Sequence, residues 1–155
     1  MHHSLRHQRL VGRLFSAFDR YLEAHPIGEI FVAPLDVVLS RHDVVEPDLL
    51  FVAGDQSEIM TDKNIQGPPA LVIEVISKRT RKKDAQIKRL LFERTGVREY
   101  WLVDPELDLV QVLRPSAAGK LARVEELTAE DDATLTTPLL PDWQLAMRAL
   151  FTASR

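Results

Sequence analysis

Two short apolar runs, each carrying one acidic residue, restrict the fold of this chain more than any other feature. Asp48 lies in the run EPDLLF (46–51), and Glu74 lies in the run PALVIEVI (69–76). Both runs have the length and composition of buried strands. Because a carboxylate is costly to bury without a cation or a hydrogen-bond donor beside it, two of them in such strands indicate a charged partner, most simply a divalent metal ion.

The composition indicates what kind of protein carries these strands. With 155 residues, 45% of them hydrophobic, the chain can bury a sizeable core, and we expect one domain over residues 1–155. It has no run long enough to span a membrane and no signal-peptide pattern, so we expect a cytoplasmic protein. The lack of cysteine excludes disulfides and thiolate metal sites and leaves oxygen or histidine ligands. A net charge of −3 argues against a protein that coats DNA generically.

Positive charge is concentrated between Lys78 and Arg94. This segment holds eight basic and two acidic residues, a net charge of +6 in a chain that is negative overall. Such a run is often a solvated helix face. Since this one begins four residues after Glu74, it also has the charge and the place expected of a surface that binds a polyanion. The candidate nucleic-acid-binding residues are Lys78, Arg79, Arg81, Lys82 and Lys83.

Hydrophobic periodicity predicts a mixed α/β fold. A helix is expected after the N-cap Ser4, a second over about 80–95 with the apolar stripe Ile87, Leu90 and Leu91, and a short amphipathic segment at 145–151. Strands are expected at 29–39 (interrupted or at an edge because of Pro34), 47–53, 71–76, 98–103, 109–113 and 120–127, with a loop over 54–69. The helix that follows the central strand implies a crossover to a parallel neighbour.

Two acids near strand ends suit phosphodiester hydrolysis. That reaction needs an activated water and neutralisation of charge on the phosphoryl oxygens, and one or two Mg²⁺ ions held by carboxylates supply most of both. We predict that Asp48, Glu74 and the backbone carbonyl of Val75 hold Mg²⁺, with Mn²⁺ as a second option. A lysine commonly orients or deprotonates the attacking water.

The choice of lysine follows from spacing. Ile76 shares the face of Glu74 but carries no proton, and Lys78 lies roughly 13 Å along an extended chain. Asp84 and Lys88 are one helical turn apart and flank the predicted stripe, with Asp84 on the side toward the sheet. Lys88 is therefore the candidate catalytic lysine. The alternative is a structural Asp84–Lys88 pair within the helix.

The segments 46–49 (EPDL), 69–77 (PALVIEVIS) and 96–105 (GVREYWLVDP), with Asp84 and Lys88, closely resemble the Uma2 family of bacterial proteins. The resemblance runs from His7-Gln8 to Leu150-Phe151. It implies a restriction-endonuclease-like PD-(D/E)XK core, an α/β fold with a mixed central sheet flanked by helices. In that family Asp48 and Glu74 match the metal-binding acids. The lysine expected two residues after Glu74 is replaced by Ile76, and its role passes to the next helix, at Lys88.

Two departures from the family pattern stand out, and neither removes a metal ligand. Lys78 stands where a proline often follows Ser77, and Phe92 stands where a helix tyrosine is common.

Other polar residues have weaker signals. Asp36, Ser77 and Asp84 are supporting candidates, although Ser77 also suits a helix cap. His2, His3 and His7 lie near a terminus, and we expect them to be exposed to solvent rather than to form a metal cluster. Tyr100 and Trp101 are expected in the core rather than stacked on bases.

The sequence leaves two functions open. The first is a Mg²⁺-dependent endonuclease that hydrolyses phosphodiester bonds in DNA, in which case a homodimer would serve to cut two strands. The second is a catalytically inactive module of the same fold that binds nucleic acid or protein. A weaker third option is a phosphodiesterase with another substrate. No element typical of base-specific groove reading is present in the sequence, so sequence specificity stays undetermined.

Overall fold

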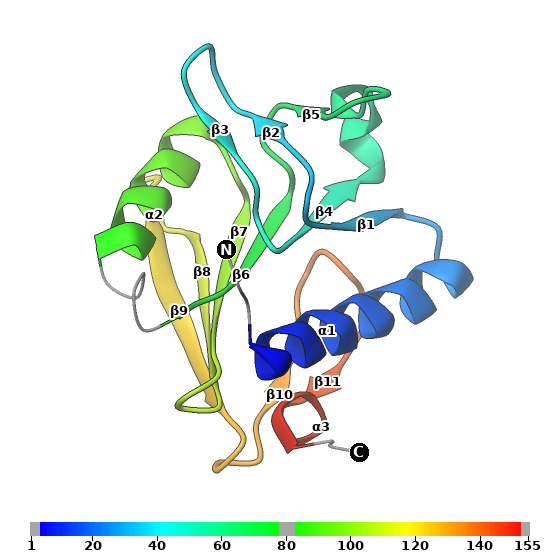
Figure 1. The fold of residues 1–155 in the computed structure, drawn as a ribbon, viewed down its shortest axis with the longest axis vertical. Helices are drawn as coiled ribbons and strands as arrows, with labels where there is room; N and C mark the ends of the chain where they lie inside the picture. Colours follow the sequence, from blue (N-terminus) through cyan, green and yellow to red (C-terminus); the bar gives the residue numbers. More distant parts are fainter. Residues whose placement is uncertain (1–3, 78–82, 153–155) are drawn as a thin grey trace.

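In the computed structural model, which describes residues 4–77 and 83–152, a six-stranded sheet runs through the centre of the molecule (Figure 1). Its strand order is β1-β4-β6-β7-β8-β9, and the bounds are Gly28–Val32, Leu49–Ala53, Leu71–Val75, Glu99–Asp104, Leu109–Pro115 and Leu121–Thr128. Neighbouring strands are antiparallel except β6 and β7, which are parallel. The mixed α/β fold is therefore confirmed.

The parallel pair arises from the predicted crossover. Strand β6 is apolar on both faces, as expected of a central strand covered on both sides. Helix α2 (Lys83–Thr95) connects it to β7, and Gly96, with φ of 99°, follows the end of the helix. Val72 of β6 pairs with Tyr100 of β7, and Glu74 pairs with Leu102.

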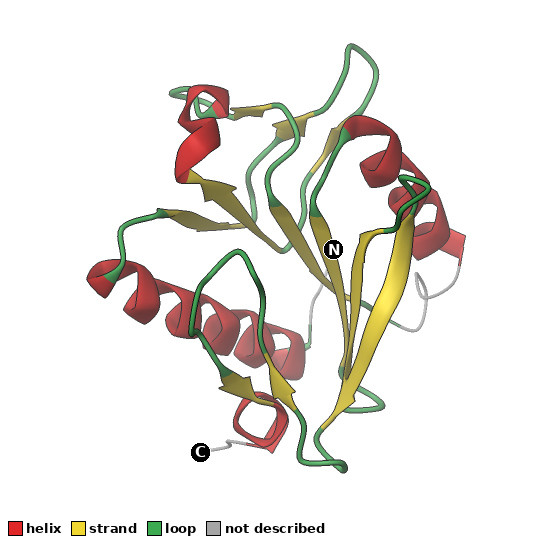
Figure 2. Ribbon diagram, turned by 180° about the vertical axis from the view of Figure 1, so that it is seen from behind, coloured by secondary structure: helices red, strands yellow, loops and turns green. Residues whose placement is uncertain are grey.

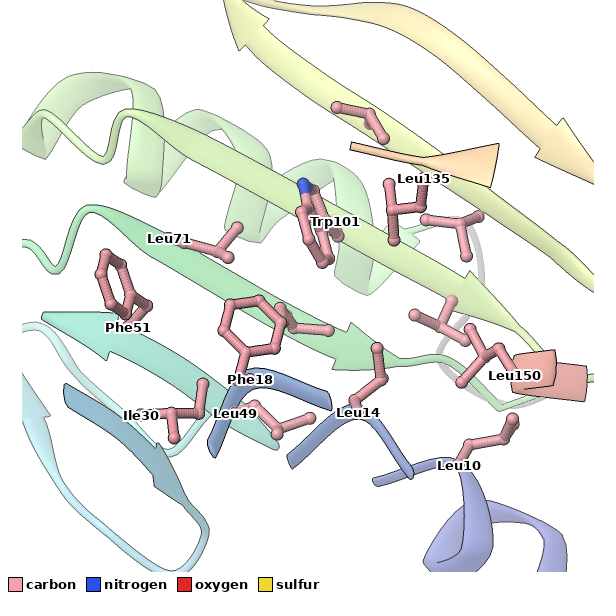
Figure 3. Close-up of a cluster of buried hydrophobic side chains, with 14 of the residues drawn as sticks. Leu10, Leu14, Phe18, Ile30, Leu49, Phe51, Leu71, Trp101, Leu135 and Leu150 are labelled. Carbon is pink, nitrogen blue, oxygen red and sulfur yellow. The ribbon is translucent and has the colours of Figure 1, made fainter. Parts of the chain in front are cut away.

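Helices cover both faces of the sheet (Figure 2). Helix α1 (Leu5–Ala24) begins at Ser4, whose Oγ accepts a hydrogen bond from the His7 amide at 3.0 Å, so the predicted N-cap is confirmed. Figure 3 shows Phe18 of this helix beside Trp101 of β7, with ring centroids 5.8 Å apart. Helix α3 (Met147–Thr152) contributes Leu150 to the same buried cluster, whereas Phe92 of α2 packs on the opposite face of the sheet.

The region between β1 and β6 differs from the prediction. The expected interruption at Pro34 is confirmed, since β1 ends at Val32 and β2 is Val37–Val38, but the two strands belong to different sheets. The expected loop at 54–69 contains a 3₁₀ helix (Gly54–Ile59) and strand β5 (Ile65–Gln66). Strand β5 pairs in parallel with β2, and β2 pairs with β3 (Val44–Val45), so these strands depend on distant partners that local periodicity does not reveal.

The predicted apolar stripe of α2 is wrong. Ile87 and Leu90 are exposed, at 56% and 46%, whereas Phe92 is completely buried. The inward face instead carries Lys88, Arg89 and Phe92. The two charged residues on this face have oxygen acceptors there: Lys88 donates to the Glu74 carboxylate and Arg89 to the Leu121 carbonyl. Hydrophobic periodicity alone cannot find a stripe of this composition.

The chain ends with a small hairpin and a helix. Strands β10 (Thr134–Leu135) and β11 (Leu145–Ala146) pair with each other and precede α3. Within the described residues, no helix combines the length and the apolar character needed to cross a membrane.

Candidate metal and phosphodiester site

Asp48 and Glu74 lie at the point where two neighbouring strands stop pairing. The antiparallel ladder of β4 and β6 ends at the pair Leu49 and Ile73. Asp48 precedes Leu49 and Glu74 follows Ile73, so the same register sets the two acids opposite each other. Residues directly opposite each other on antiparallel strands point to the same face of the sheet. The two acids therefore flank the same end of the β4–β6 ladder, and Glu74 lies on the face that α2 covers.

Beyond the last β4–β6 pair, the Asp48 carboxylate replaces a backbone carbonyl as the acceptor of a hydrogen bond from β6. Its Oδ2 accepts a hydrogen bond from the Val75 amide at 2.8 Å. By register, Val75 faces Pro47, and a proline has no N–H to donate to the Val75 carbonyl. The backbone of β4 therefore gives this carbonyl no partner from Pro47.

His7 reaches the same carboxylate from helix α1. Its Nε2 lies 3.3 Å from Asp48 Oδ1, and the residue is buried, so the prediction that His7 is exposed to solvent is wrong. His2 and His3 lie outside the described residues. A signal for His7 was present in the sequence, since His7, Leu10 and Leu14 follow one helical stripe.

Lys88 of α2 neutralises Glu74. Its Nζ donates to both Glu74 carboxylate oxygens, at 2.9 and 3.2 Å. The same ammonium lies 3.7 Å from Asp84 Oδ2, one turn earlier on the helix. Glu74 is the more buried of the two acids, with a side chain 12% exposed against 47% for Asp84. The structural pair between Asp84 and Lys88 is thus present, but the closer partner of Lys88 is Glu74.

Among the described residues, the acids around Glu74 outnumber the cations. Burial raises the pKa of Glu74, and the charges of Asp48 and Asp84 raise it further, while Lys88 offsets only part of the shift. Partial burial lowers the pKa of Lys88, but Glu74, Asp84 and Asp48 together outweigh it and leave that pKa above its ordinary value. Lys88 is therefore an ammonium at neutral pH, and the acids would gain from a further cation.

The donor set suits a hard cation. Two carboxylates and a backbone carbonyl are oxygen ligands of the type that Mg²⁺ prefers, and Mg²⁺ usually keeps several waters rather than filling its shell with protein atoms. Among the described residues there is no group of three or more histidine, cysteine, aspartate or glutamate side chains arranged to hold a metal ion. The oxygen atoms of these residues are thus of the type that binds hard divalent cations.

The remaining predicted site residues either show no contact with the two acids or lie outside the described residues. Asp36 is exposed in the loop before β2, where its backbone carbonyl accepts a hydrogen bond from the Ile65 amide at 3.0 Å. Ser77 is exposed just after β6 and has an interaction of its own. Lys83 is exposed at the start of α2. Lys78, Arg79, Arg81 and Lys82 lie outside the described residues.

Tyr100 is a second residue whose relation to the site the sequence did not indicate. Both Tyr100 and Trp101 are fully buried, as expected. Their side chains alternate across β7, so Trp101 packs under α1 whereas Tyr100 lies on the α2 face with Glu74. Only the register between β6 and β7 places its ring near the acids.

Comparison with known proteins gives a consistent assignment. The model of the Uma2 family, described as "Putative restriction endonuclease", matches residues 2–148. A solved structure described as "a putative nuclease belonging to DUF820 from Anabaena variabilis" superposes with a TM-score of 0.80 at 19% identity, covering 98% of this chain and 83% of that one. At this identity the superposition establishes a shared fold. A comparison with curated proteins finds no match.

Proposed function

Since the chain belongs to the Uma2 family and has a nuclease-like fold, we propose that it is a divalent-metal-dependent endonuclease that hydrolyses phosphodiester bonds in DNA. One observation carries the proposal. Asp48 and Glu74 flank the end of the β4–β6 ladder, the Asp48 carboxylate accepts from the amide of Val75 next to Glu74, and the ammonium of Lys88 is hydrogen-bonded to Glu74. This is the arrangement of charges that a metal-assisted attack on a phosphodiester requires.

The roles of the residues follow from their contacts. Asp48, Glu74 and the Val75 carbonyl would hold Mg²⁺ or Mn²⁺, which supplies charge neutralisation and a more acidic water when bound. His7 and the Val75 amide orient the Asp48 carboxylate. Because Lys88 is held as an ammonium, it acts by placing positive charge and a hydrogen-bond donor beside the phosphoryl oxygens, not as a general base.

Isosteric variants test the metal ligands. Asp48→Asn keeps an oxygen that can accept from the Val75 amide, and Glu74→Gln keeps one that can accept from Lys88, so both variants are expected to fold. Each should lose Mg²⁺ binding in calorimetric titrations and lose cleavage of plasmid DNA. The matched control is Asp55→Asn, an exposed acid paired with Arg98, which should behave as wild type. Wild-type cleavage in either site variant would refute the assignment.

One observation favours the second candidate, a catalytically inactive module that binds nucleic acid or protein. Lys88 already donates to both oxygens of Glu74, so that carboxylate has a cationic partner without a metal ion. Calorimetry separates the two functions, because an inactive module would not take up Mg²⁺ or Mn²⁺ at millimolar concentration. Cleavage of a simple phosphodiester but not of DNA would indicate the third option.

The DNA-binding role of the basic segment and a homodimer are further parts of the proposal. Lys83 and the four basic residues before it would hold the phosphate backbone, which makes binding fall steeply with salt. Two sites in a homodimer would cut two strands. Sedimentation with and without duplex DNA measures the oligomeric state directly.

A further inference from the structure

The hydroxyl group of Tyr100 is buried without a hydrogen-bond partner among the residues that the structure describes. The residue itself is completely buried. A hydroxyl removed from water and left unpaired lowers stability, and for that reason buried polar groups are nearly always paired in native proteins. An exception of this kind calls for a physical explanation.

The ring of Tyr100 is held on the side of the sheet that carries Glu74. Tyr100 pairs with Val72 across β6 and β7, so Glu74, two residues further along β6, is its diagonal neighbour on the same face. Aromatic side chains are long enough to reach such diagonal neighbours. Phe92 of α2 packs edge-on against the ring, with centroids 4.9 Å apart and an interplanar angle of 73°. The packing fixes the ring beneath α2, next to the site.

The hydroxyl lies in the negative field of the site. Burial raises the pKa of Tyr100, and the charges of Glu74, Asp84 and Asp48 raise it further, in that order. The group therefore remains a neutral O–H donor throughout the physiological range. Glu74 does not serve as its acceptor here, because the hydroxyl has no hydrogen-bond partner among the described residues. What the hydroxyl lacks is an acceptor oxygen.

We propose that Tyr100 is a ligand-positioning residue, whose hydroxyl donates a hydrogen bond to an oxygen atom that enters with the ligand of the Asp48–Glu74 site. This inference rests on the proposed function. The oxygen belongs either to a water carried by the divalent cation or to the phosphoryl group of the substrate. The two sources share the chemistry of an electron-rich oxygen beside a cation, and a hydroxyl donor prefers such an oxygen.

The two tyrosines of the chain provide a matched pair of variants. The Tyr21 hydroxyl on α1 donates to the Pro141 carbonyl at 2.7 Å, away from the acids. In the metal-free protein, Tyr21→Phe should lower the melting temperature, whereas Tyr100→Phe should leave it equal or higher, because no bond is lost. For Mg²⁺ affinity, the variant expected to show a loss is Tyr100→Phe and not Tyr21→Phe. Tyr100→Phe should bind Mg²⁺, or inorganic phosphate in the presence of Mg²⁺, about tenfold more weakly, and Tyr21→Phe as wild type does.

A spectroscopic signal distinguishes a hydrogen bond from an indirect effect on packing. In protein labelled at tyrosine Cζ, the two variants assign the two ¹³C resonances. The Tyr100 resonance should shift on addition of Mg²⁺ alone if a metal-bound water is the acceptor. It should shift only on further addition of inorganic phosphate if the acceptor is a phosphoryl oxygen. The Tyr21 resonance should stay in place in both titrations.

The outcomes separate this inference from the function on which it rests. If wild type binds Mg²⁺ but the Tyr100 resonance does not move in either titration and Tyr100→Phe binds as tightly, the positioning role is refuted and the metal site stands. If wild type binds no Mg²⁺ by calorimetry, the proposed function and the role of Tyr100 are both overturned. A shift of the Tyr100 resonance together with the affinity loss supports the role.

Discussion

Lys88 stands where the two acids most need a positive charge. It donates to both oxygens of Glu74 and has Asp84 as a second acid 3.7 Å away. A divalent cation that binds Glu74 would compete with this ammonium for the same oxygens. Asp84, which is nearly half exposed, is a second carboxylate with which the ammonium can pair if a cation displaces it from Glu74. In the proposed function, Lys88 therefore weakens metal binding by occupying the Glu74 oxygens, but it favours the reaction by supplying positive charge.

Replacing Lys88 by methionine should separate these effects. The variant is expected to bind Mg²⁺ about fivefold more tightly, since a partly exposed ion pair contributes about 1 kcal/mol at most. Cleavage of DNA should nevertheless fall about 100-fold, because a positioned charge and donor are lost from the reaction. Calorimetry and single-turnover cleavage measure the two quantities, with Lys63→Met, at an exposed turn, as the control. Tighter binding without a loss of rate would show that Lys88 is only a structural partner of Glu74.

The raised pKa of Glu74 predicts a dependence of stability on pH. An acid whose pKa is higher in the folded state binds protons more strongly there, so its stabilising effect is present below its ordinary value of 4.5 and is lost as pH rises through the folded-state pKa. Glu74→Gln lacks this loss. In metal-free protein, the melting temperature of Glu74→Gln relative to wild type should therefore increase from acidic to neutral pH. The exposed Glu29→Gln is the control, and a difference that is constant with pH would contradict burial as the cause.

At the scale of elements, α2 positions Lys88 through a face that hydrophobicity does not mark. Phe92 is one turn after Lys88 and is completely buried against Tyr100. Arg89 lies beside them and donates to the Leu121 carbonyl at 3.2 Å, which ties the helix to β9. These contacts, rather than Ile87 and Leu90, hold the helix over the sheet.

Two alanine substitutions on α2 test this orientation. Phe92→Ala should lower the free energy of unfolding by about 3–5 kcal/mol, as expected when a fully buried ring is removed. Ile87→Ala, at an exposed position, should change it by less than about 0.5 kcal/mol. Urea denaturation gives both values. Comparable losses in the two variants would mean that the predicted stripe, and not the observed one, faces the sheet.

At the scale of the whole molecule, a buried acid joins the sheet to the segment that follows β10. Glu99 is 2% exposed and accepts from Trp101 Nε1 at 2.6 Å and from Thr137 Oγ1 at 3.0 Å. Arg114 of β8 pairs with it at 3.2 Å and also pairs with Glu125 of β9 at 3.4 Å. Because Glu99 has a guanidinium and two neutral donors of the protein as partners, we interpret it as a structural carboxylate.

Glu99 and Glu125 form a matched test because they share Arg114. Glu99→Ala should lower the free energy of unfolding by about 3 kcal/mol, since it leaves buried donors unpaired. Glu125→Ala, at a more exposed site, should cost less than about 1 kcal/mol. Both variants should bind Mg²⁺ as wild type does, measured by calorimetry. A loss of metal affinity in Glu99→Ala would link the network to the site.

Local patterns were sufficient for much of the fold and for the main acids. Apolar runs located β4, β6 and β7, and the carboxylates in or next to two of these runs made Asp48 and Glu74 candidates, because burial of a lone charge is expensive in any fold. The same reasoning failed for the stripe of α2, where Lys88 and Arg89 occupy inward positions. It also failed for β5, whose partner β2 is more than twenty residues away.

The sequence by itself determined the order of the main strands and helices, and it indicated Asp48, Glu74 and Lys88 as candidates, since each depends on spacing along a few consecutive residues. The tertiary structure alone decided that Lys88 pairs with Glu74, that His7 reaches Asp48, and that the Tyr100 hydroxyl has no partner among the described residues. Those facts depend on strand register and helix packing. Both are set by contacts between residues far apart in the chain, for which no local pattern exists.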